Sequence, residues 1–293
     1  MDPREAAAPS PLRRGLAAAA GMPATIAISL LCVGAWSAVA LTGYSTSARH
    51  LIAAGALERG HVWAGEPWRL LTAAFLHAGA PHLLWNVSGA VLSCGPVERA
   101  LGSWRFLAIY LAGALGGSAV SLLAQDAVSV GASGALFGIV GAVLALRHRT
   151  LGSWRAFTAD GPTRHLVVAL ALWNVAGVGL ALAGVTMDHY AHLGGFASGA
   201  LAARVVTSKR PARRALPALA LLAALCAAAA WPRAALSRIT AWELEEALSE
   251  ALDRDDWHAA NALVERGVGA GLQTPFFVAA REKVEGQRKS RAP

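Results

Sequence analysis

Long apolar segments recur along the first 231 residues of this chain and constrain its fold more than any other feature. They cover residues 24–42, 82–100, 105–123, 131–146, 165–183, 189–206 and 216–231. A helix needs roughly 20 apolar residues to cross a bilayer, and in lipid its backbone must satisfy its own hydrogen bonds. The sequence therefore predicts an all-α membrane protein, a polytopic helical bundle of six core transmembrane helices plus a seventh.

Composition agrees with a membrane location. Only 15% of the 293 residues are charged, against roughly a quarter in soluble proteins. The net charge of +8 does not point to nucleic acid, because the arginines cluster in short loops between apolar segments. Cys32, Cys94 and Cys226 all fall within apolar stretches and are interpreted as small buried hydrophobes.

The basic residues also predict an orientation. They occupy alternate connections, whereas residues 124–132 and 184–188 contain no lysine or arginine. The basic side is expected to be cytoplasmic, which puts the N-terminus inside and the starts of the segments with His82, Ser133 and His192 at the outer face. Heavy use of alanine, arginine and glycine is typical of a GC-rich bacterial genome, so we expect the inner or plasma membrane of a bacterium.

The expected organisation has four parts. An alternative interpretation of the first segment is a signal peptide, because Ala38-Val39-Ala40 resembles a cleavage site. Residues 232–293 show amphipathic helical spacing and lie outside if the seventh span crosses. The parts are a mobile tail (1–21), a six-span core (22–206) with a long outer loop at 43–81, a basic loop with an additional transmembrane helix (207–231), and a C-terminal helical appendage (232–293).

A candidate nucleophile and base begin two of the segments. Ser133 lies in Gly131-Ala132-Ser133-Gly134, and a serine hydroxyl needs a base such as His192 to remove its proton. Small residues allow helices to approach closely in lipid. Gly134 and Gly138 form one such face beside Ser133, and Gly195 and Gly199 form another beside His192.

Acyl transfer also needs donors for a developing oxyanion. His82 and Asn86 are four residues apart and share one helix face, so both can point at the site. The backbone N–H of Ser133, at the start of a helix, is a third candidate donor.

The order and spacing of His82-x-x-x-Asn86, Gly131-x-Ser133-Gly134 and Ala191-His192-x-x-Gly195 resemble the rhomboid family of intramembrane serine proteases. Trp68-Arg69 and Glu98-Arg99 are similar to further features of that family, and the likeness runs from about residue 62 to 206. The resemblance implies a Ser133–His192 dyad without a third acidic member. It also implies cleavage of transmembrane substrates near their outer end, with lipid around the enzyme and no cofactor or metal.

Two details follow from the resemblance. Phe137 stands where many members have a tyrosine that stacks against the catalytic histidine, and its ring can still stack. The fifth span, with Trp173 and Asn174, is expected to admit substrate laterally.

Other interpretations remain open at this stage. Asp188, four residues before His192, would orient that histidine as in a triad, or it is a solvated loop residue. His77, His82, His189 and His192 would form a metal site, although no HExxH motif is present. Two further functions are a catalytically inactive rhomboid-like protein that binds and escorts transmembrane helices, and a small transporter or channel, for which no inverted repeat is visible.

Overall fold

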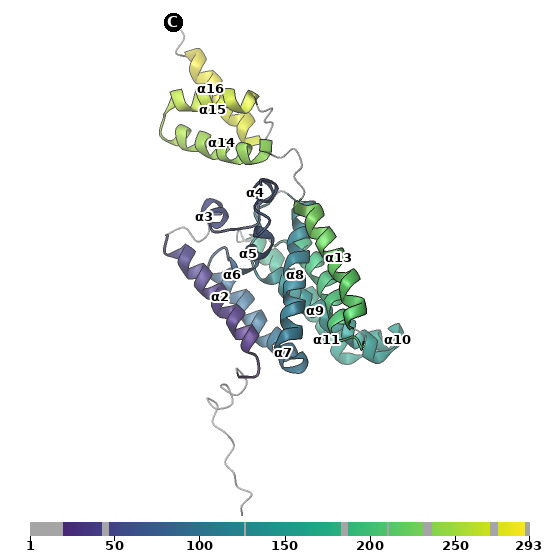
Figure 1. Ribbon diagram of the computed structural model, residues 1–293. Coiled ribbons are helices and arrows are strands. Elements are labelled where there is room, and N and C mark those ends of the chain that lie inside the picture. The colour runs from purple at the N-terminus through teal and green to yellow at the C-terminus, as the bar shows by residue number, and fades with distance from the viewer. Residues whose placement is uncertain are drawn as a thin grey trace, which may run out of the picture. The chain divides into compact units, whose positions relative to one another are not determined.

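Figure 1 shows the computed structural model of the protein as a ribbon. The structure describes residues 20–42, 47–125, 127–182, 187–209, 211–230, 236–269 and 275–290, with side chains undescribed at 174–182, 211–214, 236–243, 275 and 290. Residues 1–19, which make up most of the expected N-terminal tail, and the side chain of Asn174 therefore lie outside the described part. The chain divides into two compact units, one containing the helices up to α13 and the other the last three helices.

The first unit is a bundle of helices whose bounds follow the expected apolar segments within a few residues. The prediction of an all-α, multi-pass membrane protein is confirmed, because the described residues form helices and connections with one isolated β-bridge. The long helices are α2 (Pro23–Ala40), α8 (Ser103–Ala124), α9 (Ser133–Leu151), α11 (Gly161–Leu182), α12 (His189–Val206) and α13 (Pro211–Ala230).

Among the described residues, α2, α8 and α9 are long and apolar enough to cross a membrane by themselves. The apolar part of α13, Ala215–Ala230, is shorter. The segment expected at 82–100 is continuous but irregular, running through α6 (Ala80–Gly89), η2 (Ala90–Cys94) and α7 (Gly95–Leu101). The η2 turn is a wider π-helical turn, and Pro96 accounts for it because a proline ring clashes with the carbonyl four residues earlier.

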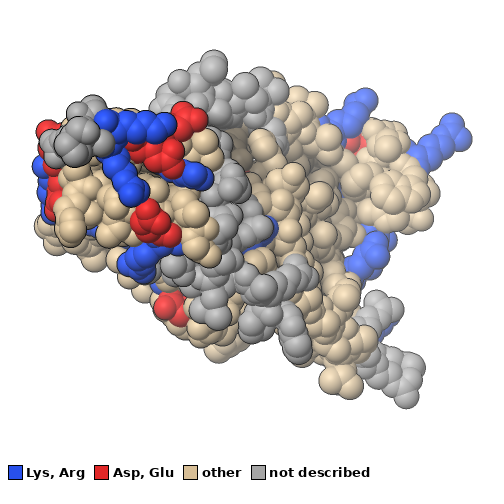
Figure 2. Space-filling model, turned by 90° about the horizontal axis from the view of Figure 1, so that it is seen from above, with Lys and Arg blue, Asp and Glu red and all other residues tan. Residues whose placement is uncertain are grey.

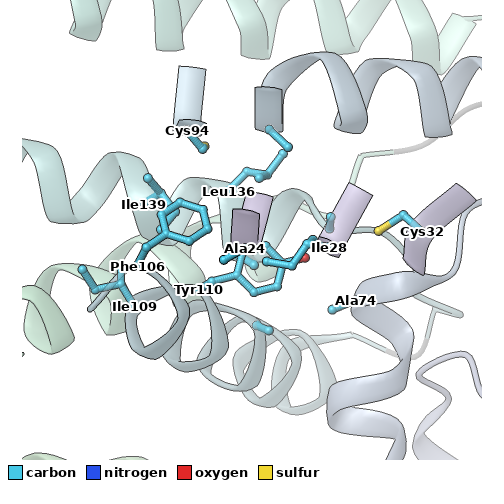
Figure 3. Close-up of a cluster of buried hydrophobic side chains, with 14 of the residues drawn as sticks. Ala24, Ile28, Cys32, Ala74, Cys94, Phe106, Ile109, Tyr110, Leu136 and Ile139 are labelled. Carbon is cyan, nitrogen blue, oxygen red and sulfur yellow. The ribbon is translucent and has the colours of Figure 1, made fainter. Parts of the chain in front are cut away.

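Small residues allow the central helices to pack closely, and aromatic residues fill the space beside them. Figure 3 shows Phe106 and Tyr110 of α8 lying among side chains from α2 and α9, including Ile28, Leu136 and Ile139. All five side chains are buried. This cluster holds α2 against the α8–α9 pair and so fixes the frame in which α9 begins at Ser133.

The connection 43–81 is folded rather than extended in its described part, residues 47–81. It contains α3 (Ala48–Ala53), α4 (Arg59–Trp63), α5 (Arg69–Thr72) and the 3₁₀ turn η1 (Ala73–Phe75). The buried Arg69 guanidinium donates to the carbonyls of Ile52 and Ala56, which ties the start of α5 to α3 and the residues just after it.

Arginine also attaches this connection to the bundle. Arg59 donates through Nε to the carbonyl of Leu122 (2.7 Å) and through Nη2 to that of Gln125 (2.7 Å), at the end of α8. These carbonyls have no partner within their own helix, so a cation there is favourable. Leu57 and Ser129 form the β-bridge, which joins the same connection to the segment before Ser133.

The second unit contains α14 (Leu236–Asp253), α15 (Trp257–Gly269) and α16 (Pro275–Ser290). Its core is formed by Leu248, Val264 and Phe277, one from each helix, so it buries an apolar cluster of its own. In Figure 2, acidic and basic side chains gather at the left of the visible face, and much of the remaining described surface is uncharged.

Glu98 of α7 fixes the start of α2 at the end of the bundle opposite Ser133. This buried carboxylate accepts hydrogen bonds from the backbone N–H groups of Ala24 (2.8 Å) and Thr25 (2.7 Å) and from the hydroxyls of Thr25 and Ser103. The first N–H groups of a helix have no partner within it, so Glu98 supplies the cap from a different helix.

We expect Glu98→Ala to destabilise the folded protein by about 2–5 kcal/mol, because it leaves several buried N–H and O–H donors without the charged acceptor to which they were bonded. Glu98→Gln should cost less, since its amide oxygen still accepts. Thermal unfolding in detergent, followed by a thiol dye that reaches the buried Cys32 and Cys94, would measure both losses. An unchanged midpoint in Glu98→Ala would contradict this role.

Candidate active site

Ser133 and His192 lie at the starts of α9 and α12, at the same end of the bundle. Ser133 Oγ is 2.9 Å from His192 Nε2, which is hydrogen-bonding distance. The His192 side chain is buried, whereas Ser133 is half-buried. Fifty-nine positions separate them in the chain, so the pairing depends on how α9 and α12 are held together.

Glycines at the α9–α12 contact explain the short distance. A Cβ atom added to Gly195 would overlap the carbonyl of Gly134, and one added to Gly199 would overlap the backbone of Gly138. The glycine faces identified in the sequence therefore meet each other directly. Without side chains between them, the two backbones approach closely enough for the serine and histidine at their ends to bond.

Phe137 holds the imidazole from one side. Its ring lies one turn below Ser133 and is parallel to the His192 ring, with centroids 4.0 Å apart and an interplanar angle of 4°. Stacking of this kind restricts rotation of the imidazole. The Nδ1 atom of His192 has no hydrogen-bond partner within the part of the chain that the structure describes.

His82 and Asn86 of α6 lie against Gly131, beside the start of α9. A Cβ atom built on Gly131 would be 2.8 Å from His82 Nε2 and 3.8 Å from Asn86 Nδ2. Gly131 has φ +123°, a conformation that other residues rarely adopt, and its N–H donates to the carbonyl of Ala73 (2.9 Å). The amide of Asn86 donates to the carbonyl of His82 (3.0 Å), and its Oδ1 is buried.

A small polar cavity adjoins Ser133. Its polar lining comes from Ser118 of α8, Ser129, Ser133 itself and Asp188, and its apolar lining includes Ala73. It has room for about one or two water molecules. A hydroxyl beside a cavity of this kind can be reached by water from within the protein.

The Asp188 carboxylate makes no hydrogen bond to the His192 imidazole in the described part of the chain. It accepts hydrogen bonds from the hydroxyls of Ser121 and Ser129 and from the backbone N–H of Ala191. It is therefore neither a ligand of the imidazole nor a simple solvated loop residue. The sequence did not single out Ser118, Ser121 or Ser129. The capping role of Asp188 was recognisable, because an aspartate just before an apolar helix is a common N-cap residue.

The four histidines considered for a metal site form two separate pairs. The rings of His77 and His82 are 5.1 Å apart, and those of His189 and His192 are 6.1 Å apart. No group of three or more His, Cys, Asp or Glu side chains suited to a metal occurs among the described residues. The site geometry thus centres on the Ser133–His192 pair.

The fifth span also contacts the second near this site. Trp85 of α6 and Trp173 of α11 have ring centroids 4.3 Å apart, and Trp173 lies next to Gly89. This aromatic contact joins α6 to α11.

We expect Gly199→Ala to destabilise the protein by about 1–3 kcal/mol, because the added methyl group must push α12 away from α9. Gly34→Ala is the matched control, since a Cβ there meets nothing within 4 Å. Thermal unfolding of both variants in detergent would test this. Equal midpoints for the two variants would mean that the α9–α12 approach is not tight.

Comparison with known proteins finds relatives for the part of the chain that contains these site residues. Residues 64–209 match the family model of the Rhomboid domain. Rhomboid protease GluP of Bacillus subtilis (strain 168) is 38% identical over 164 residues, which are 56% of this chain and 31% of that protein.

Other relatives give similar values. RHOMBOID-like protein 7 of Arabidopsis thaliana is 39% identical over 138 residues, which are 46% of this chain and 42% of that protein. Putative rhomboid protease YdcA of Bacillus subtilis is 44% identical over 82 residues, which are 27% of this chain and 41% of that protein. The chain thus spans less than half the length of each of these three relatives.

Proposed function

Because this chain belongs to the rhomboid family, we propose that it is an intramembrane serine endopeptidase that cleaves transmembrane helices through a Ser133–His192 dyad. The observation that carries the proposal is the 2.9 Å separation of Ser133 Oγ and His192 Nε2. Residues 22–206 form the protease core, α13 adds a seventh span, and α14–α16 form an appendage.

The first half of the reaction makes an acyl-enzyme. Ser133 Oγ bonds to the scissile carbonyl carbon while its proton passes to His192 Nε2. The C–N bond then breaks, and the imidazolium gives that proton to the leaving amine. For Nε2 to accept a proton, the neutral imidazole must carry its own proton on Nδ1, and the stack with Phe137 keeps that ring in place.

An oxyanion forms in each half of the reaction and needs hydrogen-bond donors to stabilise it. The side chains of His82 and Asn86 approach the start of α9 at Gly131, and the Ser133 N–H has no partner within its own helix. Donors fixed in this way stabilise the developing negative charge without having to reorganise. In the second half, water attacks the ester with His192 again as base, and the polar cavity beside Ser133 is a source of that water.

The substrate is a single-span helix that unwinds readily and has a small residue at the cut, because a carbonyl within a regular helix is not open to attack. The arginine distribution supports a cytoplasmic N-terminus and a site that opens to the outer face of a bacterial membrane. Substrate reaches the dyad laterally between α6 and α11, where Trp85 and Trp173 now touch.

The dyad is tested with purified protein in liposomes and a single-span test substrate. We expect Ser133→Ala and His192→Ala each to lower cleavage by at least about 10³-fold. Ser93→Ala and His165→Ala are matched controls, because both side chains are exposed.

Cleavage that persists in Ser133→Ala would refute the proposed mechanism. Binding of the substrate without cleavage by the native protein would instead favour the inactive, helix-escorting alternative.

Lateral access is tested with Trp173→Ala, which removes the contact with Trp85. If opening limits access, kcat/KM for the transmembrane substrate should rise a few-fold, whereas labelling by a small fluorophosphonate should stay unchanged. Trp154→Ala, at an exposed tryptophan of α10 (Trp154–Ala159), is the control. Equal changes in cleavage and labelling would exclude a gate at this contact.

A further inference from the structure

The Asp188 carboxylate connects three segments that surround Ser133 and His192. Its Oδ2 accepts from the hydroxyl of Ser129 (2.6 Å), in the segment before α9, and from that of Ser121, in the last turn of α8. Its Oδ1 accepts from the N–H of Ala191 (2.8 Å), in the first turn of α12. A single side chain therefore holds the ends of three helices together.

Ser129 extends this connection to the long loop before α6. Its N–H donates to the carbonyl of Leu57 (2.9 Å), and its carbonyl accepts from the N–H of Leu57 (3.0 Å). All three polar groups of Ser129 are thus bonded, two to the loop and one to Asp188. The position of Asp188 is set by the loop as well as by the bundle.

Each member of the dyad lies four residues after a residue of this hydrogen-bond network. Ser133 comes four residues after Ser129, and His192 comes four residues after Asp188, whose carbonyl accepts from the His192 N–H (3.1 Å). Asp188 and His192 are one helical turn of about 5.4 Å apart, whereas a short non-helical connection joins Ser129 to the start of α9 at Ser133. A shift at either anchor is therefore passed on to the reacting atom.

The contact between α8 and α12 leaves little room for compensation. A Cβ atom on Gly117 would be 2.7 Å from the carbonyl of Ala191, so these backbones already touch. Any movement of α12 after loss of the Asp188 bonds must therefore be away from α8 or along it. Either movement changes the distance from His192 to Ser133.

We propose that Asp188 is a positioning residue that sets the Ser133–His192 distance by joining the ends of α8, α9 and α12, rather than a third member of the dyad. This inference rests on the proposed protease function. It differs from a triad in one measurable respect, since a triad acid accepts a hydrogen bond from the imidazole, whereas the Asp188 carboxylate accepts its bonds from two serine hydroxyls and a backbone N–H.

The distinguishing experiment compares Asp188→Ala with Asp188→Asn in the liposome assay. Asparagine keeps the acceptor for Ala191, and its amide can donate to the two serine hydroxyls, which can accept as well as donate. We expect Asp188→Asn to keep kcat within about threefold of the native value. For comparison, the same change in a triad acid costs about 10⁴-fold in kcat.

Asp188→Ala should lower kcat by about 10- to 100-fold and leave KM nearly unchanged, because a displacement of about 1 Å is enough for a loss of that size. Asp160→Ala is the matched control. Asp160 precedes α11 and accepts from the N–H of Thr163 (2.9 Å) and from Arg147, so it joins segments in the same way but away from Ser133. Its loss should affect stability and spare kcat.

A combined Ser121→Ala and Ser129→Ala variant keeps the charge of Asp188 and the cap on α12, and it replaces Asp188→Ala if that protein does not fold. It should lower kcat by about tenfold. Native activity in this double variant, or an Asp188→Asn variant as inactive as Asp188→Ala, would overturn the proposal.

Amide hydrogen exchange separates this inference from the proposed function. Peptides covering 127–133 and 187–193 should exchange faster in Asp188→Ala than in Asp160→Ala, whether or not the protein cleaves any substrate. Failure of the native protein to cleave would count against the protease function alone. Unchanged exchange in Asp188→Ala would count against the positioning role alone.

Discussion

The close approach of the α9 and α12 backbones is the constraint on which the rest of this structure depends. In lipid the hydrophobic effect does not drive two helices together, so the contact relies on van der Waals packing between small residues. Gly134 and Gly138 meet Gly195 and Gly199 with no room for a methyl group between them. That contact brings Ser133 and His192 to hydrogen-bonding distance, and Phe137 then has the space to stack on the imidazole.

The ends of these helices present a second problem, because each leaves backbone groups unpaired in or near an apolar medium. The chain solves it with charged side chains that come from other segments. Glu98 caps α2, Asp188 caps α12 while bonding to Ser121 and Ser129, and Arg59 binds the last carbonyls of α8. Each such bond also positions one element against another. The loop before α6 is thereby part of the framework of the site, although none of its residues belongs to the dyad.

The sequence was sufficient for the helical membrane fold because apolar length and glycine spacing are local properties of a segment. It also identified Ser133, His192, His82 and Asn86 as candidates, since their shared position at segment starts can be read without coordinates. It did not indicate the partners of Asp188 or the Leu57–Ser129 bridge. Those bonds join residues 59–72 positions apart, and the side chains involved have no periodic pattern. Likewise, the π-helical turn at 90–94 depends on Pro96, and an apolar run alone does not locate it.

The most direct test of the Ser133–His192 dyad is to find which atom reacts with a fluorophosphonate, by mass spectrometry of peptides from the labelled protein. We expect a single adduct on Ser133 in the native protein and no adduct in His192→Ala, because an unassisted serine hydroxyl is too weak a nucleophile. An adduct on a different residue, or labelling of Ser133 in His192→Ala at the native rate, would contradict it.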